Sequence, residues 1–563
     1  MSMTPSYVHG ANGPPLIGKT IGVYFDEAVA ARPDDLALIV RHQSVRWTWA
    51  ELKAQVDALA AGLVALGLAP GERIGIWAPN CWEWTVTQFA TAKAGLVLVN
   101  INPAYRVGEV EYALNKVGCK ALITAVRHKT SDYVAMLRDL APELAVSTPN
   151  SLKAGRLPQL KLVVTLGDAP HPGCLSFAEV CALGGVEEHA RLATLADQLQ
   201  FDDAINIQFT SGTTGSPKGA TLSHHNILNN AQYIGLAMRL KPGERICIPV
   251  PLYHCFGMVG GNLVSLVHAA TMVYPGEAFE ARALLETIEA ERCSVMYGVP
   301  TMFIAALADP EFERFDLQCM RTGIMAGSPC PVEVMRQVVE RVHVDEITIA
   351  YGMTETSPVS FQSDTTDPLE RRVSTVGRVQ PHLEVKIVDA EGRITPRGEQ
   401  GELCTRGYSV MLGYWDDPEK TAEAIDSGGW MHTGDLARLD DEGFCNITGR
   451  IKDLVIRGGE NVYPREIEEF LYAHTAIQDV QVFGVPDKRL GEELCAWIVL
   501  RPGQALAEDA LREFCRGQIA HYKVPRYVRF VETFPTTVTG KVQKFAMREV
   551  MIAELGLTVA KTA

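Results

Sequence analysis

Residues 210–218 combine glycines, hydroxyl side chains and one lysine directly after a strand-like run at 205–209. Glycine lets main-chain N–H groups turn toward an anion, the hydroxyls add donors, and Lys218 adds a positive charge. This composition is typical of a phosphate-binding loop, although an ordinary polar hairpin is the alternative. It does not match the P-loop of ATPases, because Lys218 is followed by Gly219 instead of Ser or Thr. The nine residues are Thr210, Ser211, Gly212, Thr213, Thr214, Gly215, Ser216, Pro217 and Lys218.

Five more motifs follow along the chain, and each alone has an ordinary structural reading. Tyr351 could be a core residue at a strand end, Thr354 the N-cap of a helix, and Thr433-Gly434-Asp435 a turn. The five motifs are Ala326-Gly327-Ser328-Pro329, Tyr351-Gly352-Met353-Thr354-Glu355, Trp430-Met431-His432-Thr433-Gly434-Asp435, Gly449-Arg450-Ile451-Lys452-Asp453 and Thr539-Gly540-Lys541. In this order, and with the loop, they resemble the adenylate-forming superfamily of acyl-CoA synthetases, coumarate ligases, luciferases and peptide-synthetase adenylation domains.

The resemblance covers nearly the whole chain and implies a two-step reaction of a carboxylic acid with ATP and coenzyme A. The carboxylate would attack the α-phosphorus of ATP to give an acyl-adenylate, and the thiol of CoA would then take the acyl group. Negative charge that develops in the first step must be neutralised. By resemblance, Glu355 would hold a Mg²⁺ ion, Thr354 would donate to the α-phosphate, and Lys541 would contact the carboxylate and the α-phosphate.

The same resemblance assigns a nucleoside site to three of the motifs. Tyr351-Gly352 would offer an aromatic face to adenine, and Gly327-Ser328 would line the other side of the base. Asp435 would accept hydrogen bonds from both ribose hydroxyls, since a carboxylate is an acceptor-only group. Arg450 would reach the same sugar.

The resemblance also implies that the small terminal domain pivots between the two steps. Lys452 stands at the pivot position of the family, and the rotation would withdraw Lys541 and bring Gly458-Gly459 beside a channel for the pantetheine arm of CoA. His254 would gate the path of the thiol, or it is a hydrogen-bonded core histidine.

We expect a medium-chain fatty acid as substrate, because segments such as Asn102-Pro103-Ala104-Tyr105 resemble the medium-chain acyl-CoA synthetases. Some long-chain and medium-chain enzymes of the family that this chain resembles gate an acyl tunnel with a tryptophan. No tryptophan occurs between Trp84 and Trp415, so a tunnel for long chains is in doubt. The alternatives are an aryl or other short acid, and a carrier-protein thiol as acceptor. A non-catalytic nucleotide-binding protein is disfavoured, because the expected phosphate and metal residues are all present.

Strand-like runs that alternate with helical stretches place these motifs in an α/β fold. The runs are expected at 73–77, 120–124, 162–165, 204–209 and 246–250, and a β-rich subdomain is expected after residue 362. The fold class is therefore α/β: a large N-terminal domain of layered α/β subdomains plus a β-rich subdomain, with a small mobile α+β C-terminal domain. We expect the large domain at 1–449, a hinge at 450–452 and the small domain at 453–563.

The composition excludes some partners. The chain has 563 residues, with 52 Lys and Arg against 67 Asp and Glu, and its net charge of −15 disfavours nucleic acid and anionic membranes. Residues 522–548 are locally basic, which suits an anionic ligand or a solvated face. The stretch 257–274 is expected to be a buried helix instead of a membrane span, and the 13 cysteines to be reduced thiols. Lacking a visible leader, the chain is expected in the cytoplasm, and a homodimer is one option for its assembly.

Overall fold

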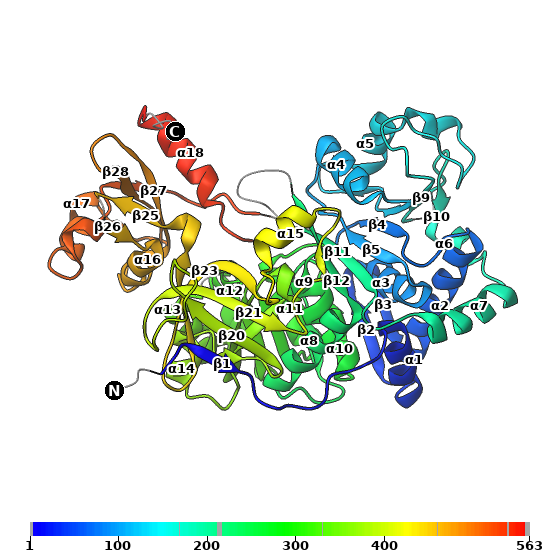
Figure 1. Ribbon diagram of the computed structural model, residues 1–563, viewed down its shortest axis with the longest axis horizontal. Helices are drawn as coiled ribbons and strands as arrows, with labels where there is room; N and C mark the ends of the chain where they lie inside the picture. The colour runs from blue at the N-terminus through cyan, green and yellow to red at the C-terminus, as the bar shows by residue number, and fades with distance from the viewer. Residues whose placement is uncertain are drawn as a thin grey trace.

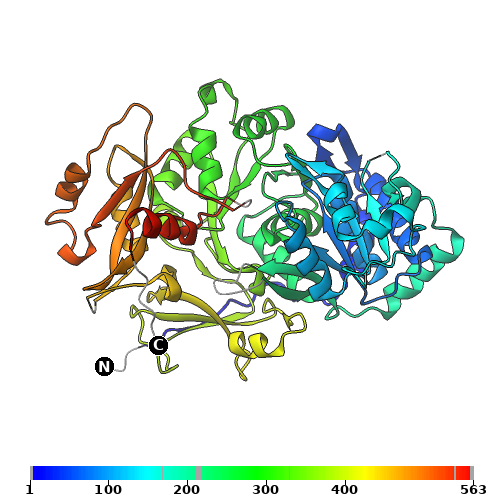
Figure 2. The ribbon, with the colours of Figure 1, turned by 90° about the horizontal axis from the view of Figure 1, so that it is seen from above.

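The computed structural model describes residues 4–167, 169–210, 217–328, 330–458, 460–537 and 540–557. Two large mixed sheets, a five-stranded antiparallel sheet and a separate C-terminal sheet organise the chain. Figures 1 and 2 show the blue N-terminal helices at one end of the molecule and the orange and red C-terminal domain at the other, beside the green part of the chain. Within the described ranges, no helix is long and apolar enough to cross a membrane.

The eight-stranded sheet is parallel over its first six strands and antiparallel at its last two. Its parallel strands at 73–77, 97–100, 121–124 and 162–165 are mostly apolar and buried, as expected where helices cover both faces of a sheet. Its order is β10 (Leu175–Ser176), β9 (Leu162–Thr165), β6 (Ala121–Thr124), β4 (Arg73–Trp77), β5 (Val97–Asn100), β11 (Ala204–Thr210), β12 (Lys218–Ser223) and β22 (Gly413–Tyr414).

The nine-stranded sheet is parallel in its centre and antiparallel at both edges. Ala326 pairs with Ala350, so the motifs that follow two adjacent parallel strands emerge at the same edge of this sheet. Its order is β19 (Arg378–Val379), β18 (Val359–Gln362), β17 (Glu346–Gly352), β16 (Thr322–Ala326), β15 (Val295–Gly298), β13 (Arg245–Cys247), β14 (Thr271–Tyr274), β2 (Leu36–Val40) and β3 (Val45–Thr48).

Several of the helices that pack around these sheets begin at a side-chain cap. The hydroxyl of Thr48 accepts from the N–H of Glu51, whose side chain accepts from Thr48 in return, and this capping box starts α2. The helices are α1 (Ile21–Ala31), α2 (Trp49–Ala65), α3 (Trp82–Ala94), α4 (Val107–Val117), α5 (Tyr133–Leu140), α6 (Phe177–Cys181), α7 (Val186–Gln198), α8 (His224–Ala237), α9 (Cys255–Gly257), α10 (Val264–Val267), α11 (Ala281–Glu291), α12 (Pro300–Leu307), α13 (Val332–Val342), α14 (Leu369–Ser374) and α15 (Pro418–Ala424).

Two expected elements differ from the structure. The strand expected at 246–250 is the shorter β13, and the single helix expected at 257–274 is wrong. The chain is helical only from Cys255 to Val267, with a π-helical turn η3 (Met258–Leu263) in the middle. It then forms β14, because the apolar run 271–274 fills the place between β13 and β2 in the sheet.

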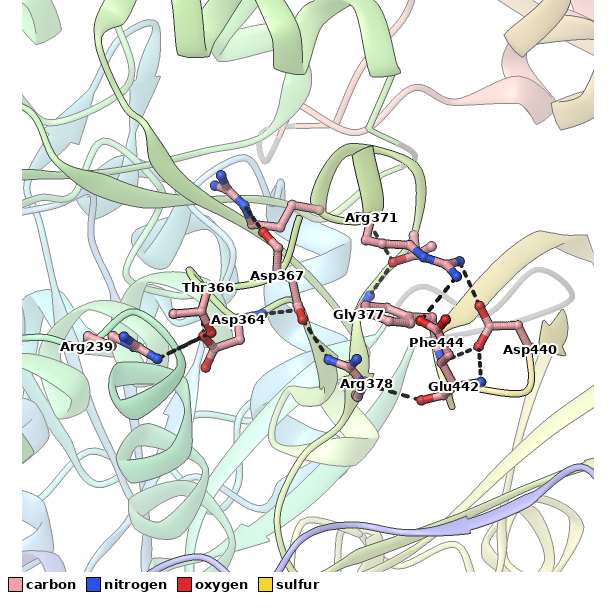
Figure 3. Close-up of polar contacts among 12 residues, drawn as sticks. Arg239, Asp364, Thr366, Asp367, Arg371, Gly377, Arg378, Asp440, Glu442 and Phe444 are labelled. Atoms are coloured by element: carbon pink, nitrogen blue, oxygen red, sulfur yellow. Dashed lines mark hydrogen bonds and ion pairs between the residues drawn. The ribbon is translucent and has the colours of Figure 1, made fainter. Parts of the chain in front are cut away.

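The β-rich subdomain is a five-stranded antiparallel sheet whose edge strand comes from the N-terminus. Arg371 of α14 pairs with Asp440 (2.8 Å) and Glu442 (3.2 Å), and the Arg378 guanidinium lies 3.8 Å from the centroid of the Phe444 ring. These contacts hold the turn after β23 against the nine-stranded sheet (Figure 3). The order is β1 (Tyr7–His9), β20 (Leu383–Val388), β21 (Gly401–Gly407), β23 (Met431–Leu439) and β24 (Cys445–Arg450).

The C-terminal domain has a sheet and apolar clusters of its own. Buried residues of β27, β28 and α16 form one cluster, and α18 packs on the other face of the same strands. The elements are η6 (Ile451–Asp453), β25 (Val455–Arg457), β26 (Glu460–Val462), α16 (Pro464–Tyr472), β27 (Ile477–Asp487), β28 (Gly491–Leu500), α17 (Glu508–Cys515), η7 (His521–Lys523), β29 (Tyr527–Phe530) and α18 (Lys544–Glu554).

Candidate active site

The β11–β12 hairpin places the two ends of the predicted phosphate loop side by side. Thr210 pairs with Lys218 across the hairpin, and the carbonyl of Pro217 accepts a hydrogen bond from the Tyr112 hydroxyl (3.0 Å). The Lys218 ammonium lies 4.1 Å from the centroid of the Tyr414 ring on the neighbouring strand β22. The remaining loop residues, Ser211, Gly212, Thr213, Thr214, Gly215 and Ser216, lie outside the described residues.

Glu355 joins this hairpin to the edge of the nine-stranded sheet. It is 5% exposed, and its Oε1 accepts hydrogen bonds from the hydroxyls of Thr210 (3.2 Å) and Tyr414 (2.9 Å). A carboxylate offers about four lone-pair sites, so Glu355 can still bind a cation, and its hard oxygen suits Mg²⁺. Tyr414 escaped the sequence reasoning, because only the pairing of β22 with β12 brings it here.

Thr354 is buried in the short 3-10 turn η5 (Thr354–Thr356) beside Glu355. The N-cap of this turn is Met353, so the alternative reading of Thr354 as a helix N-cap is wrong. The reason is that Thr354 already lies inside the turn. Its hydroxyl lies 3.9 Å from the sulfur of Cys255, which connects η5 to the start of α9.

Asp435, Tyr351 and Arg450 meet at one carboxylate. Asp435 is 5% exposed, its Oδ2 accepts from the Tyr351 hydroxyl (2.6 Å), and its Oδ1 accepts from Arg450 Nε (2.8 Å). Burial and the Asp435 charge both raise the pKa of Tyr351, so its hydroxyl remains a donor. Burial would lower the pKa of Arg450, but the Asp435 charge and hydrogen bond raise it overall. The carboxylate is thus oriented from two sides and retains lone pairs for further donors.

The glycines of the predicted adenine site lie where a side chain would clash. A Cβ on Gly352 would lie 1.6 Å from the carbonyl oxygen of Pro358, and Gly327 has a φ of +90°, which favours glycine. Gly327 and Ser328 follow β16, and Tyr351 and Gly352 end the adjacent β17. The structure therefore brings all four residues to one sheet edge.

His254 is half-buried at the start of α9, near Thr354. Its Nδ1 accepts a hydrogen bond from the N–H of Phe256 (3.1 Å) and lies 3.6 Å from the sulfur of Cys255. Burial, with a smaller contribution from the positive charge of Lys541, lowers the pKa of His254 to about 4. The ring is therefore neutral near neutral pH.

Lys541 reaches this group of residues from the C-terminal domain. The carbonyl of the preceding Gly540 accepts a hydrogen bond from the Thr301 hydroxyl of α12 (3.4 Å), and a Cβ on Gly540 would lie 2.9 Å from the side chain of Val299. The Lys541 side chain is in contact with solvent, yet partial desolvation by the surrounding protein lowers its pKa. The positive charge of Arg450 adds to this effect, and the negative charge of Asp435 opposes it. Thr301, which the sequence reasoning missed, thus helps to dock the loop of Lys541.

Two family models match the chain. The model described as "AMP-binding enzyme" matches residues 25–415, well over half of the chain, and the model described as "AMP-binding enzyme C-terminal domain" matches residues 466–541. The chain belongs to the AMP-binding enzyme family.

Relatives and solved structures agree with this assignment. The chain is 49% identical over 558 residues to the mitochondrial medium-chain acyl-CoA ligase ACSF2 of Bos taurus, a match that covers 98% of this chain and 91% of the relative. It is similar to the anthranilate CoA ligase AuaEII in complex with anthranoyl-AMP, with a TM-score of 0.85, 28% identity and coverage of 96% of this chain and 99% of that chain. It is also similar to ATP-bound MatB from Rhodopseudomonas palustris, with a TM-score of 0.81, 29% identity and coverage of 95% and 99%. The expected α/β fold with a distinct C-terminal domain is confirmed, and so is the expectation of an acyl-CoA synthetase.

In this AMP-binding enzyme, Gly458 lies in the C-terminal domain and Lys452 lies at the junction of the two domains. Gly458 turns the β25–β26 hairpin at a φ of +62°, and its N–H donates to the carbonyl of Leu490 (2.8 Å) within the C-terminal domain. Gly459 lies outside the described residues. Lys452 lies in η6, directly between β24 of the large domain and β25 of the small one.

The basic stretch 522–548 of this AMP-binding enzyme is not an open anion site. Except for Lys541, each of its cations pairs with a carboxylate of the C-terminal domain. These carboxylates lie outside the stretch in sequence, so the charge balance within the stretch does not reveal them. The pairs are Lys523–Glu466, Arg526–Asp487, Arg529–Glu554, Lys544–Glu468 and Arg548–Glu492.

Proposed function

We propose that the protein is an ATP-dependent acid–CoA ligase that activates a medium-chain fatty acid through an acyl-adenylate. The observation that supports this best is the convergence of residues from both domains: Thr301 docks the loop of Lys541, and the charges of Glu355 and of the Asp435–Arg450 pair act on the Lys541 ammonium. The family assignment and the likeness to an ATP-bound and an acyl-AMP-bound enzyme agree with it.

In the first step, a carboxylate oxygen of the acid attacks the α-phosphorus of ATP, and the bond to pyrophosphate breaks. Lys541 and Thr354 stabilise the charge that develops on the carboxylate and the α-phosphate, while Asp435 and Arg450 hold the ribose. Glu355 would hold a Mg²⁺ ion, which would supply charge neutralisation on the phosphates. Lys541 would act only in this step.

In the second step, the sulfur of CoA attacks the acyl carbon, the bond to AMP breaks, and the thiol proton is released to solvent. The terminal domain would first rotate about 450–452, which withdraws Lys541 and brings Gly458-Gly459 to the pantetheine arm. His254, which is neutral above its pKa of about 4, would border the path of the thiol without adding charge.

An aryl or other short acid is the second candidate substrate, because the chain superposes well on an anthranilate CoA ligase. The acceptor could also be a carrier-protein thiol. A cytoplasmic location and a homodimer stay predictions, which cell fractionation and light scattering can check.

The test is product release from purified protein with ATP, Mg²⁺, CoA and one acid at a time. Octanoate should give AMP, pyrophosphate and octanoyl-CoA faster than butanoate, dodecanoate or benzoate, and chelation of Mg²⁺ should stop the reaction. Turnover of benzoate alone would replace the medium-chain assignment by the aryl one, and turnover with a phosphopantetheinylated carrier alone would replace CoA. Failure to release AMP with every acid would overturn the proposed function.

A further inference from the structure

Strand β23 carries a bulge immediately before Asp435. Glu402 of β21 pairs with Leu436, but Cys404, two residues later, pairs with His432. A separation of two residues along β21 therefore lies opposite a separation of four residues along β23, so the extra residues of β23 are not paired in the regular ladder. Gly434 within this bulge has a φ of +70°, a conformation that glycine adopts without a steric penalty. Bulges of this kind re-aim the side chains beside them.

The Glu402 carboxylate closes this bulge with both of its oxygens. Oε1 accepts a hydrogen bond from the main-chain N–H of Gly434 (3.1 Å), and Oε2 accepts from Nδ1 of His432 (2.9 Å). The Thr433 hydroxyl donates to the carbonyl of Leu403 (2.7 Å) and accepts from the N–H of Asp435 (3.1 Å). Each residue from His432 to Asp435 thus takes part in a hydrogen bond that involves a side chain.

The opposite side of the His432 ring faces a second anchored carboxylate. Its Nε2 lies 3.7 Å from Oδ2 of Asp426, whose Oδ1 accepts from the main-chain N–H groups of Gly428 (2.8 Å) and Trp430 (2.9 Å). The imidazole is therefore held between Glu402 and Asp426, and it cannot turn without breaking one of these contacts.

We infer that Glu402 and His432 are positioning residues for nucleotide binding, which they serve by fixing the bulge that aims Asp435 at the ribose. This inference rests on the ribose role of Asp435 in the proposed function. Hydrogen bonds to a charged acceptor are the strong ones, and two of them act on one short segment here. Without them, the Thr433 hydroxyl is the remaining side-chain restraint within the bulge, and Asp435 loses its alignment with Tyr351 and Arg450.

The same region contains donor atoms of a metal-binding type, but they are already in use. One ligand atom each of Glu402, Cys404 and His432 lie within 4.8 Å of one another. The Nδ1 of His432 carries the proton that it donates to Glu402, so this nitrogen has no lone pair for a metal, and burial raises the pKa of the Cys404 thiol to about 12. These contacts favour a structural brace over a metal site.

The test is the preference for ATP over 2′-deoxy-ATP and 3′-deoxy-ATP, measured as the ratio of kcat/KM in pyrophosphate release. Glu402→Ala should raise the KM for ATP and lower this preference by about tenfold, the equivalent of one lost hydrogen bond, while the KM for the acid stays unchanged. His432→Phe should act in the same direction. His432→Asn, whose amide nitrogen can replace Nδ1, should restore most of the preference.

Two reference variants distinguish a failure of this inference from a failure of the ribose role proposed for Asp435. Glu384→Gln alters a carboxylate of the same sheet that pairs with Arg406 (2.8 Å), and it should keep the wild-type preference. Asp435→Asn should lose the preference. If Asp435→Asn loses it but Glu402→Ala and His432→Phe keep it and lower only the melting temperature, the inference is overturned. An unchanged preference in Asp435→Asn would instead refute the ribose role of Asp435 itself.

Discussion

At the scale of single residues, the Asp435 carboxylate is oriented by side chains of the protein itself. Tyr351 holds one oxygen and Arg450 the other, so the groups that would meet the ribose need little rearrangement. Catalytic sites gain most from charges and dipoles that are preorganised in this way. Lys541 differs, because it enters from another domain and is docked through its backbone.

Replacement of Lys541 by alanine should separate the two half-reactions. The rate of acyl-adenylate formation, measured as pyrophosphate release, should fall by about 10²- to 10³-fold, because a single electrostatic contact in the transition state is lost. Thioester formation from supplied acyl-adenylate should be retained. Lys523→Ala, which removes a cation paired within the terminal domain, is the matched control and should leave both steps intact. Equal losses in both steps would contradict the role given to Lys541.

The sequence located the residues of this site but not all of their partners. Glu355, Asp435, Arg450 and Lys541 stand in short motifs that can be read locally. Tyr414 could not be found in this way, because it reaches Glu355 only through the pairing of β22 with β12. A lone Gly-Tyr pair carries no local signal for such a contact.

At the scale of elements, apolar runs predicted the parallel strands best. The strand predicted at 73–77 is β4, and the one predicted at 162–165 is β9, because buried parallel strands are uninterrupted apolar segments. The three-residue β1 was missed because its partner β20 lies nearly the whole length of the large domain away in sequence, so no local pattern indicates their pairing. The predicted helix at 257–274 failed because apolar runs do not distinguish a buried helix from a buried strand.

The proposed pivot at η6 should depend on the rotational freedom of its backbone torsions. Lys452→Pro fixes φ near −65° and removes an N–H, so we expect it to slow thioester formation more than acyl-adenylate formation. Lys452→Ala keeps the backbone free and serves as the comparison. The two half-reactions are measured separately, as for Lys541. A normal second step in the proline variant would argue against a pivot at this place.

At the scale of the whole molecule, a buried histidine makes stability depend on pH. His224 at the start of α8 is fully buried, its Nδ1 accepts from the N–H of Ile21 (3.1 Å), and burial lowers its pKa to about 3. The folded protein keeps this ring neutral, whereas the unfolded chain protonates it below its ordinary pKa. The unfolded state therefore binds more protons, and stability falls as the pH drops from about 6.5 toward 3.

The corresponding measurement compares melting temperatures at neutral pH and at about pH 5, within this window. The wild-type protein should lose more on acidification than His224→Asn, whose amide oxygen can accept the same N–H and does not titrate. Equal losses in the two proteins would show that His224 does not set the acid response.

The position of Arg450 has a mechanical consequence. Arg450 is the last residue of β24, and the turn that leads into the terminal domain begins at the next residue. Its guanidinium donates to the Asp435 carboxylate, which we propose binds the ribose. A rotation of the small domain would therefore first displace a residue that is proposed to hold the nucleotide, and we expect the affinity for AMP to differ between the two orientations. Departure of the spent nucleotide would then be timed by the same movement that admits the thiol.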